Sequence, residues 1–166
     1  MFKALDSVPL FKNVDDGTLQ LLESLFESFS CPAGTIIFEQ GDPANYIYLL
    51  LSGSVEVRYK PYDGPPITIT TLSKGHFFGW SAAIGNPTYT SGAVCKEDCA
   101  AIRMNKTDLH SFCAREPEAG CIILDLLAQS VSNRWQDAHS QIQSLLNSRL
   151  VTNGYETRPA QEKEEP

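Results

Sequence analysis

The sequence has no long hydrophobic run and no excess of positive charge. No stretch approaches the roughly 20 consecutive apolar residues that a membrane-spanning helix needs, and the longest, Ile47 to Leu51, has the length of a strand. The formal net charge is -7, from 13 Lys and Arg against 20 Asp and Glu. A nucleic-acid-binding surface usually carries clustered Lys and Arg. The composition therefore predicts neither a membrane protein nor a protein that binds nucleic acid.

The N-terminus lacks the apolar segment of a signal peptide, which predicts a cytoplasmic protein. The cysteine count is odd and the spacing is irregular, which is typical of reduced thiols in that compartment. Three residues separate Cys95 from Cys99, so a thioredoxin-like redox pair, a zinc site and an iron–sulfur ligand set are all disfavoured. The five cysteines are Cys31, Cys95, Cys99, Cys113 and Cys121.

The chain has 166 residues, of which 42% are hydrophobic and 20% charged. These values are typical of one globular domain that needs no disulfide or metal to be stable. The last stretch, residues 151–166, is polar and contains Gly and Pro. We expect a folded domain at residues 1–150 and a disordered tail at residues 151–166.

Hydrophobic periodicity divides the domain into a helical start, an all-β middle and a helical end. Asp15 or Asp16 can cap a helix within residues 1–28, Asn105 can cap another, and a further helix is expected to begin near Glu116. The middle alternates short strand-like runs with Gly and Pro, which is typical of a jelly roll or barrel. The expected strands are residues 35–38, 46–51, 55–60, 67–70, 76–78, 89–94 and 100–104.

The last predicted helix carries an apolar seam whose members are alternately four and three residues apart. This spacing repeats for about three heptads, which favours a homodimer through that helix. The alternative is a helix that packs on the core of its own domain. The seam consists of Leu124, Ala128, Val131, Trp135, Ala138, Ile142 and Leu145.

Three glycine-containing motifs carry a family resemblance: Phe38 to Tyr48, Leu51 to Val57, and Leu72 to Gly79. With the order of elements, they resemble the cyclic nucleotide-binding domains of the catabolite activator protein and of protein kinase A regulatory subunits, over about residues 5–147. The resemblance implies a mainly β, α+β fold. Its centre is a jelly-roll β-barrel (a double-stranded β-helix), flanked by N-terminal helices and a C-terminal helix pair.

The resemblance also implies a site. In that family the roll holds a cyclic nucleotide, a short helix presents backbone N–H groups to the phosphate, an Arg pairs with the phosphate, and a Glu after the Phe-Gly pair accepts from the ribose. The closing helix caps the base and often forms the dimer. The corresponding candidate residues here are Phe78, Gly79, Trp80, Ser81, Ala82, Ala83, Thr88, Thr90 and Ser91.

This chain departs from that pattern at the two charged positions. Trp80 follows Gly79 where the Glu is expected, and no Arg occurs between Arg58 and Arg103. Burying an unpaired phosphate is costly, and neutral hydroxyls do not replace a bidentate Arg. We therefore expect weak or no binding of cyclic AMP and cyclic GMP. Trp80 either forms an aromatic wall for another ligand or fills the pocket, and the hydroxyls of Thr88, Thr90 and Ser91 are either ligand contacts or ordinary strand side chains.

Other chemistry has little support. The cupin enzymes share the jelly roll but need closely spaced histidines, whereas His76, His110 and His139 are isolated, with His76 alone near the candidate site. We expect no enzyme, no metal and no cofactor. About 16 residues follow Leu150, too few for the helix-turn-helix domain of DNA-binding relatives.

The leading hypothesis is a stand-alone, ligand-sensing regulatory domain that forms a homodimer. One alternative is a structural dimerisation or protein-interaction module whose pocket Trp80 closes. A further alternative is a genuine cyclic nucleotide binder that uses backbone amides.

Overall fold

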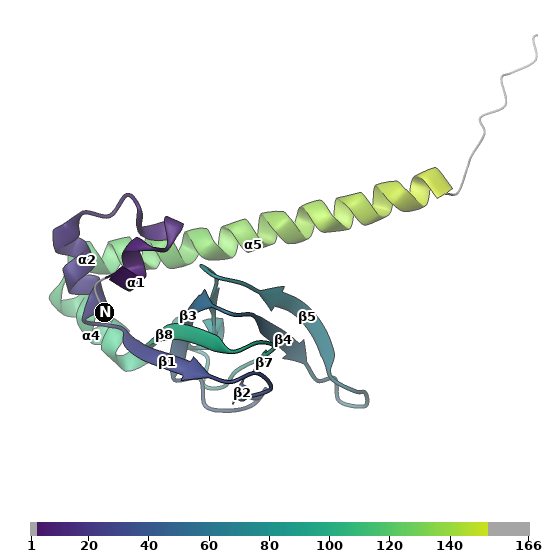
Figure 1. Cartoon of the computed structure of the whole chain (residues 1–166), viewed down its shortest axis with the longest axis horizontal. Coiled ribbons are helices and arrows are strands. Elements are labelled where there is room, and N and C mark those ends of the chain that lie inside the picture. The colour runs from purple at the N-terminus through teal and green to yellow at the C-terminus, as the bar shows by residue number, and fades with distance from the viewer. Residues whose placement is uncertain (1–2, 153–166) are drawn as a thin grey trace, which may run out of the picture. The chain divides into compact units, whose positions relative to one another are not determined.

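The computed structural model describes residues 3–152, although not every side chain near the two ends of that range (Figure 1). Contacts divide the chain into two units, Met1–Ser130 and Val131–Pro166. The described part of the second unit is helix, up to Thr152. From residue 153 on, the predicted disordered tail lies outside the described residues. None of the described helices is long and apolar enough to cross a membrane.

The first unit is built on two antiparallel four-stranded sheets, which confirms the predicted mainly β jelly roll. The sheets remain separate among the described residues instead of closing into one continuous barrel. One sheet has the order β1-β8-β3-β6 and the other the order β2-β7-β4-β5. The strands are β1 (Glu27–Cys31), β2 (Ile36–Phe38), β3 (Tyr46–Ser52), β4 (Val55–Tyr59), β5 (Ile67–Leu72), β6 (Phe77–Phe78), β7 (Gly92–Cys95) and β8 (Cys99–Asn105).

Alternation along β3 assigns its residues to two faces of the first sheet. Leu49 pairs with Phe77 on one side and Ile102 on the other, and all three are buried. The next row, which points to the opposite face, consists of Tyr48 between Phe78 and Arg103. This second face is aromatic and looks toward Phe38 of the other sheet. The aromatic row therefore lies inside the roll.

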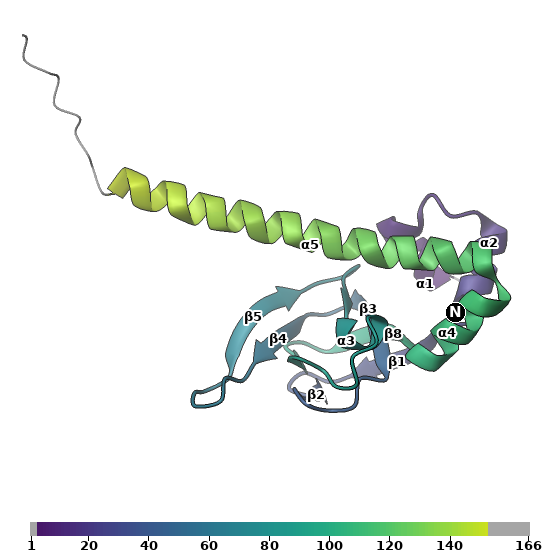
Figure 2. The same ribbon diagram turned by 180° about the vertical axis from the view of Figure 1, so that it is seen from behind.

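The N-terminal helices are α1 (Lys3–Asp6) and α2 (Asp16–Glu23), with a short 3-10 helix at Pro9–Phe11 between them. Asp15 is the residue that caps α2, because its carboxylate accepts from the Thr18 N–H at 3.0 Å. The predicted helical zone to residue 28 was too long. Residues 27–31 form β1, which pairs with β8, because they alternate in burial and have no helical apolar stripe. Figures 1 and 2 show α1, α2 and α4 gathered beside β1 and β8.

Two helices follow the roll, as predicted: α4 (Lys106–Arg115) and α5 (Pro117–Thr152). The Asn105 side chain caps α4 by accepting from the Thr107 N–H at 2.8 Å. At the corner between the helices, Gly120 lies directly against Cys113: a Cβ at position 120 would be 2.8 Å from the Cys113 Cα. The close approach of α4 and α5 therefore depends on a residue without a side chain.

Candidate functional site

The candidate site begins where β6 ends and the four-residue helix α3 (Trp80–Ala83) starts. Gly79 makes this turn with φ +81°, a conformation that residues with a side chain rarely adopt. A Cβ on Gly79 would be 2.7 Å from the Tyr46 carbonyl oxygen. The Phe-Gly motif thus places α3 directly against the start of β3. We call residues 78–91, from β6 to the approach of β7, the cassette.

Within the cassette, the side chain of Ser81 connects α3 to the segment before β7. Ser81 is buried, and its hydroxyl oxygen accepts from the Thr90 N–H at 3.2 Å. The Thr90 hydroxyl lies 3.4 Å from the same oxygen. The Ser81 carbonyl also accepts from the Asn86 N–H at 2.8 Å. Two of the predicted site residues, Ser81 and Thr90, are therefore in contact.

The segment before β7 is also bonded to the loop that precedes β3. The Pro87 carbonyl accepts from the Ala44 N–H, and Tyr89 exchanges two backbone hydrogen bonds with Gly41 and Asp42, all at 2.9 Å. Thr88 is exposed and forms an isolated bridge with Pro43. The predicted strand at residues 89–94 was therefore wrong at its start, because β7 begins at Gly92. The preceding residues are instead ordered by this loop.

Tyr89 is a site residue that the sequence prediction missed. Its buried phenol donates to the Tyr46 carbonyl at 2.7 Å and accepts from the Tyr46 N–H at 3.1 Å. Burial raises the pKa of Tyr89 to about 12, so the hydroxyl keeps its proton at neutral pH. Within residues 87–93, where the resemblance places an Arg, Tyr89 is a buried side chain that points inward. Its position between two exposed threonines was the available signal, since alternation marks an inward-facing residue.

An aromatic stack fills the interior of the roll beside the cassette. Phe38 lies almost parallel to Tyr89, with ring centroids 3.7 Å apart. Phe78 stacks on Tyr48 at 4.9 Å and lies 6.2 Å from Phe38. Phe78, predicted as a ligand contact, is thus a buried member of this stack.

Trp80, the first residue of α3, packs against the face of the first sheet that is opposite the aromatic stack. Its ring lies edge-on to Phe77 at 6.1 Å, and Phe77 is the neighbour of Phe78 that points away from the aromatic stack. The indole N–H is buried and has no hydrogen-bond acceptor among the described residues. Trp80 is therefore partly buried against the hydrophobic core.

Of the remaining predicted residues, Ala82 is buried, Ala83 packs partly on the core and Ser91 is half-buried.

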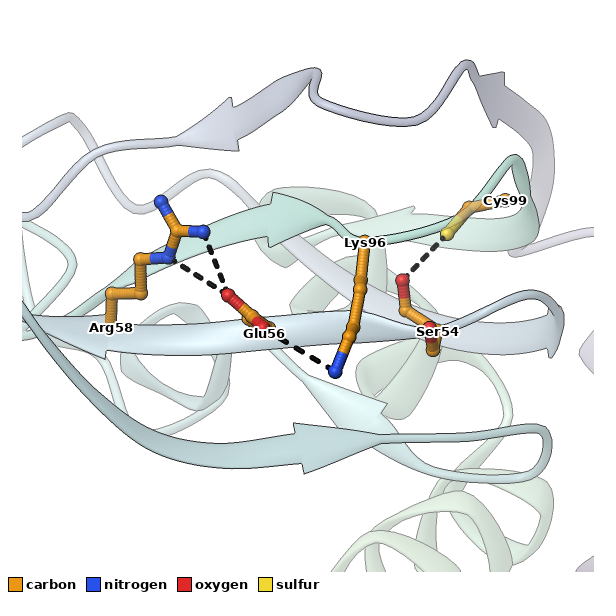
Figure 3. A network of polar contacts seen from close by, with 5 residues as sticks. All are labelled: Ser54, Glu56, Arg58, Lys96 and Cys99. Atoms are coloured by element: carbon orange, nitrogen blue, oxygen red, sulfur yellow. Dashed lines mark hydrogen bonds and ion pairs between the residues drawn. The ribbon is translucent and has the colours of Figure 1, made fainter.

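The two arginines that flank the cassette in sequence are both engaged elsewhere. Arg58 donates to Glu56 through Nε at 3.1 Å and through a terminal nitrogen at 2.7 Å, and Lys96 lies 3.7 Å from the other carboxylate oxygen (Figure 3). Arg103 donates to Glu27 at 2.6 Å and lies over the Tyr46 ring at 4.1 Å. Neither guanidinium is available to α3 in this arrangement.

The cysteines are free thiols, and three of them meet at one end of the roll. Cys31 and Cys99 are partners across β1 and β8, and both lie within hydrogen-bonding reach of Cys95. Burial raises the pKa of both Cys95 and Cys99. The Cys99 thiol also donates to the Ser54 carbonyl at 3.2 Å (Figure 3). Across the part of the chain that the structure describes, no three His, Cys, Asp or Glu side chains form a metal-binding group.

The predicted seam on α5 can be judged at its first three positions. Leu124, Ala128 and Val131 are exposed, and the two large ones have exposed fractions of 48% and 47%. Within the first unit, another face of α5 is buried, with Ala119, Ile123, Leu126, Leu127 and Ser130. The helix therefore packs on its own core through residues outside the seam. The side chains of Trp135, Ala138, Ile142 and Leu145 lie outside the described part of the structure.

Comparisons with known proteins agree with the fold. A CRP-like cAMP-activated global transcriptional regulator of Mycobacterium tuberculosis is 25% identical over 129 residues, covering 78% of this chain and 58% of the regulator. A cyclic nucleotide-binding domain from Methylobacillus flagellatus KT superposes with a TM-score of 0.75 at 20% identity, covering 86% of this chain and 80% of that one. The predicted absence of nucleic-acid binding remains a prediction, since one relative is a transcriptional regulator.

A third similar structure is the regulatory subunit of a cAMP-independent protein kinase A from Trypanosoma brucei, solved as a triple mutant bound to cAMP. It superposes with a TM-score of 0.65 at 20% identity, covering 84% of this chain and 49% of that subunit. The chain thus spans only part of the regulators that it resembles. The cyclic nucleotide-binding domain family matches residues 28–116, more than half of the sequence. The chain belongs to the cyclic nucleotide-binding domain family.

Proposed function

We propose that this chain is a non-enzymatic regulatory domain with weak or no affinity for cyclic AMP and cyclic GMP. The observation that carries the proposal is that the cassette itself, residues 78–91, contains no Lys or Arg. No Arg lies between Arg58 and Arg103. Arg58 forms an ion pair with Glu56 of its own strand, and Arg103 forms one with Glu27 of β1. Regulation would then depend on a ligand without a cyclic phosphate or on a protein partner.

The energetics favour this assignment. An anion transferred from water into a site without a charged partner loses several kcal/mol of hydration. Thr90 offers only a neutral hydroxyl, and Ser81 is already bonded to the Thr90 N–H. Trp80 stands where a Glu would accept from the ribose, and an indole has a donor but no acceptor. Recognition of the phosphate and recognition of the ribose are therefore both weakened in this chain.

The Trypanosoma brucei comparison gives further support. That subunit is named as cAMP-independent, and its cAMP-bound form carries a Thr-to-Arg substitution among its three changes. A member of this fold without cAMP dependence is therefore already known. For the present chain, the analogous loss remains our proposal.

Titration calorimetry with cyclic AMP and cyclic GMP tests the proposal. We expect no heat of binding from the natural chain at micromolar concentrations. Two double variants are measured in parallel, Trp80→Glu with Thr90→Arg and Trp80→Glu with Tyr89→Arg. Positions 89 and 90 are chosen for the Arg because both lie in the segment that faces α3. Binding by a double variant alone would identify the missing charges as the cause. Micromolar binding by the natural chain would contradict the proposal and favour recognition through backbone amides.

We also propose a homodimer through α5. Leu124 and Val131 are exposed on the helix at heptad spacing, whereas Ile123 and Leu127 are the residues buried in the same domain. An apolar seam in water is normally covered by a partner helix. Should cyclic nucleotides and other small molecules all fail to bind, the same dimer would fit the alternative of a protein-interaction module.

A further inference from the structure

The cassette is held in place by hydrogen bonds within the chain. Its last segment, residues 86–90, is tied on two sides. On one side are the loop before β3 and the first residue of β3, and on the other is α3. Each of these contacts joins the segment to another part of the same chain.

The first tie is the phenol of Tyr89. It satisfies both the N–H and the carbonyl of Tyr46, and its ring is stacked on Phe38. If the hydroxyl leaves, two polar groups of half-buried Tyr46 lose this partner, and each such loss costs about 1–3 kcal/mol where water does not replace the bond. The Tyr89 backbone is also bonded to Gly41 and Asp42. Ring and backbone therefore fix this residue together.

The second tie is the buried hydroxyl of Ser81. It accepts from the Thr90 N–H, so α3 and the segment before β7 keep a fixed separation. The Asn86 N–H bonds to the carbonyl of the same residue. Ser81 thus joins the start of the cassette to both ends of its last segment.

We propose that Ser81 and Tyr89 form a latch that holds the cassette in one conformation without a ligand. A ligand changes a protein only as far as it binds two states with different affinity, and a segment that is already ordered leaves no disorder-to-order step to drive. The response of this domain to a signal therefore does not run through ordering of the cassette. This inference deepens the proposed function but does not require that cyclic nucleotides fail to bind.

Amide hydrogen exchange of the full chain, resolved by residue, tests the latch. In the natural chain we expect the amides of Gly41, Ala44, Tyr46 and Thr90 to be protected, and equally so with and without millimolar cyclic AMP or cyclic GMP. In Tyr89→Phe, we expect exchange at Gly41 and Ala44 to accelerate at least about fivefold along with Tyr46. If the hydrogen bonds of the Tyr89 phenol acted only locally, amide exchange would accelerate at Tyr46 alone. Tyr62→Phe is the matched control, because Tyr62 is fully exposed.

A second variant keeps the test decisive if Tyr89→Phe does not fold. Ser81→Ala removes the acceptor of the Thr90 N–H, and we expect faster exchange at Thr90 and Asn86 while β3 and β8 stay protected. Exchange in residues 86–90 of the natural chain as fast as in an unfolded peptide would overturn the latch. So would protection that appears only when a cyclic nucleotide is added. Calorimetric binding with unchanged protection would instead refute the proposed function and leave the latch standing.

Discussion

The phenol oxygen of Tyr89 lies 2.7 Å from the carbonyl oxygen of Tyr46 and 3.1 Å from its backbone nitrogen. One side chain thus bonds both backbone polar groups of the first residue of β3. Because Tyr89 comes from the segment before β7, this contact joins parts of the chain that are 43 residues apart. It links the position of the cassette to the stability of the roll.

Removing that hydroxyl should destabilise the protein. We expect Tyr89→Phe to lower the free energy of unfolding by about 1–3 kcal/mol, because the N–H and the carbonyl of half-buried Tyr46 lose this partner. Urea unfolding followed by circular dichroism measures the change, with Tyr62→Phe as an exposed control that should be neutral. Equal midpoints for Tyr89→Phe and the natural chain would show that water replaces the phenol.

The raised pKa of Tyr89 predicts a loss of stability in alkali. Burial holds this pKa at about 12 in the folded protein, whereas in the unfolded chain it is about 10. The contribution is complete below pH about 10 and declines as the pH rises toward 12, because the unfolded state releases the proton first. Burial also raises the pKa of Tyr48. Unfolding measured from about pH 8 to 11 should therefore show a shallower decline in Tyr89→Phe, but not a flat one; identical slopes would contradict the assignment.

Two glycines with the same backbone angle allow the cost of backbone strain to be distinguished from the cost of a steric clash. Gly79 and Gly85 both have φ +81°, but a Cβ would meet the Tyr46 carbonyl oxygen at 2.7 Å only at position 79. At position 85 it would meet nothing within 4 Å. Gly85→Ala should cost about 1–2 kcal/mol of backbone strain, and Gly79→Ala distinctly more. Thermal unfolding of the two variants checks this order, which an equal shift in Tm would refute.

The thiols should react in two classes. Cys121 is exposed and Cys113 half-buried, whereas Cys31, Cys95 and Cys99 are buried. Burial raises the pKa of Cys95 and Cys99, which lowers the thiolate fraction further. With a disulfide reagent at neutral pH, we expect Cys121 to be labelled first and the buried three only on unfolding. Rapid labelling of all five without unfolding would show that this end of the roll opens.

The homodimer makes a separate prediction. Leu124→Asp together with Val131→Asp places charge in the exposed seam, and we expect a dimer to become a monomer in light scattering at micromolar concentration. Asn133→Asp adds charge at an exposed position away from the seam and should leave the dimer intact. A natural chain that is already monomeric would rule out the interface.

Strand alternation, helix caps and glycine motifs were sufficient to predict the roll, the cap residue Asn105 and a helix beginning near Glu116, where α5 begins at Pro117. Those signals depend on residues that are close in the sequence, so they can be recognised from the sequence alone. The end of α2 and the strand β1 were harder. Residues 27–31 become a strand through pairing with β8, whose residues are about 70 positions further along the chain, and five residues give only a short local pattern.

The turn into α3 was predicted from the sequence, but the contacts of the cassette residues were not; whether these residues bind a ligand stays a prediction. The Phe78-Gly79 pair marks the turn into α3 because its backbone requires glycine. The partner of Ser81 and the role of Tyr89 depend on which side chains meet across the roll, which the sequence does not encode locally. Trp80 was expected inside or across the pocket, whereas its ring contacts Phe77 on the other face of the strand. Rotamer choice in a packed interior decides that difference.

The contact between Gly120 and Cys113 gives the corner of α4 and α5 a mechanical stop. A Cβ added at position 120 would lie 2.8 Å from the Cys113 Cα, so the corner has no room for a side chain there. A larger residue at position 120 would force α4 and the start of α5 apart. Gly120 therefore limits how wide this corner is, and its replacement would lengthen the distance between the two helices.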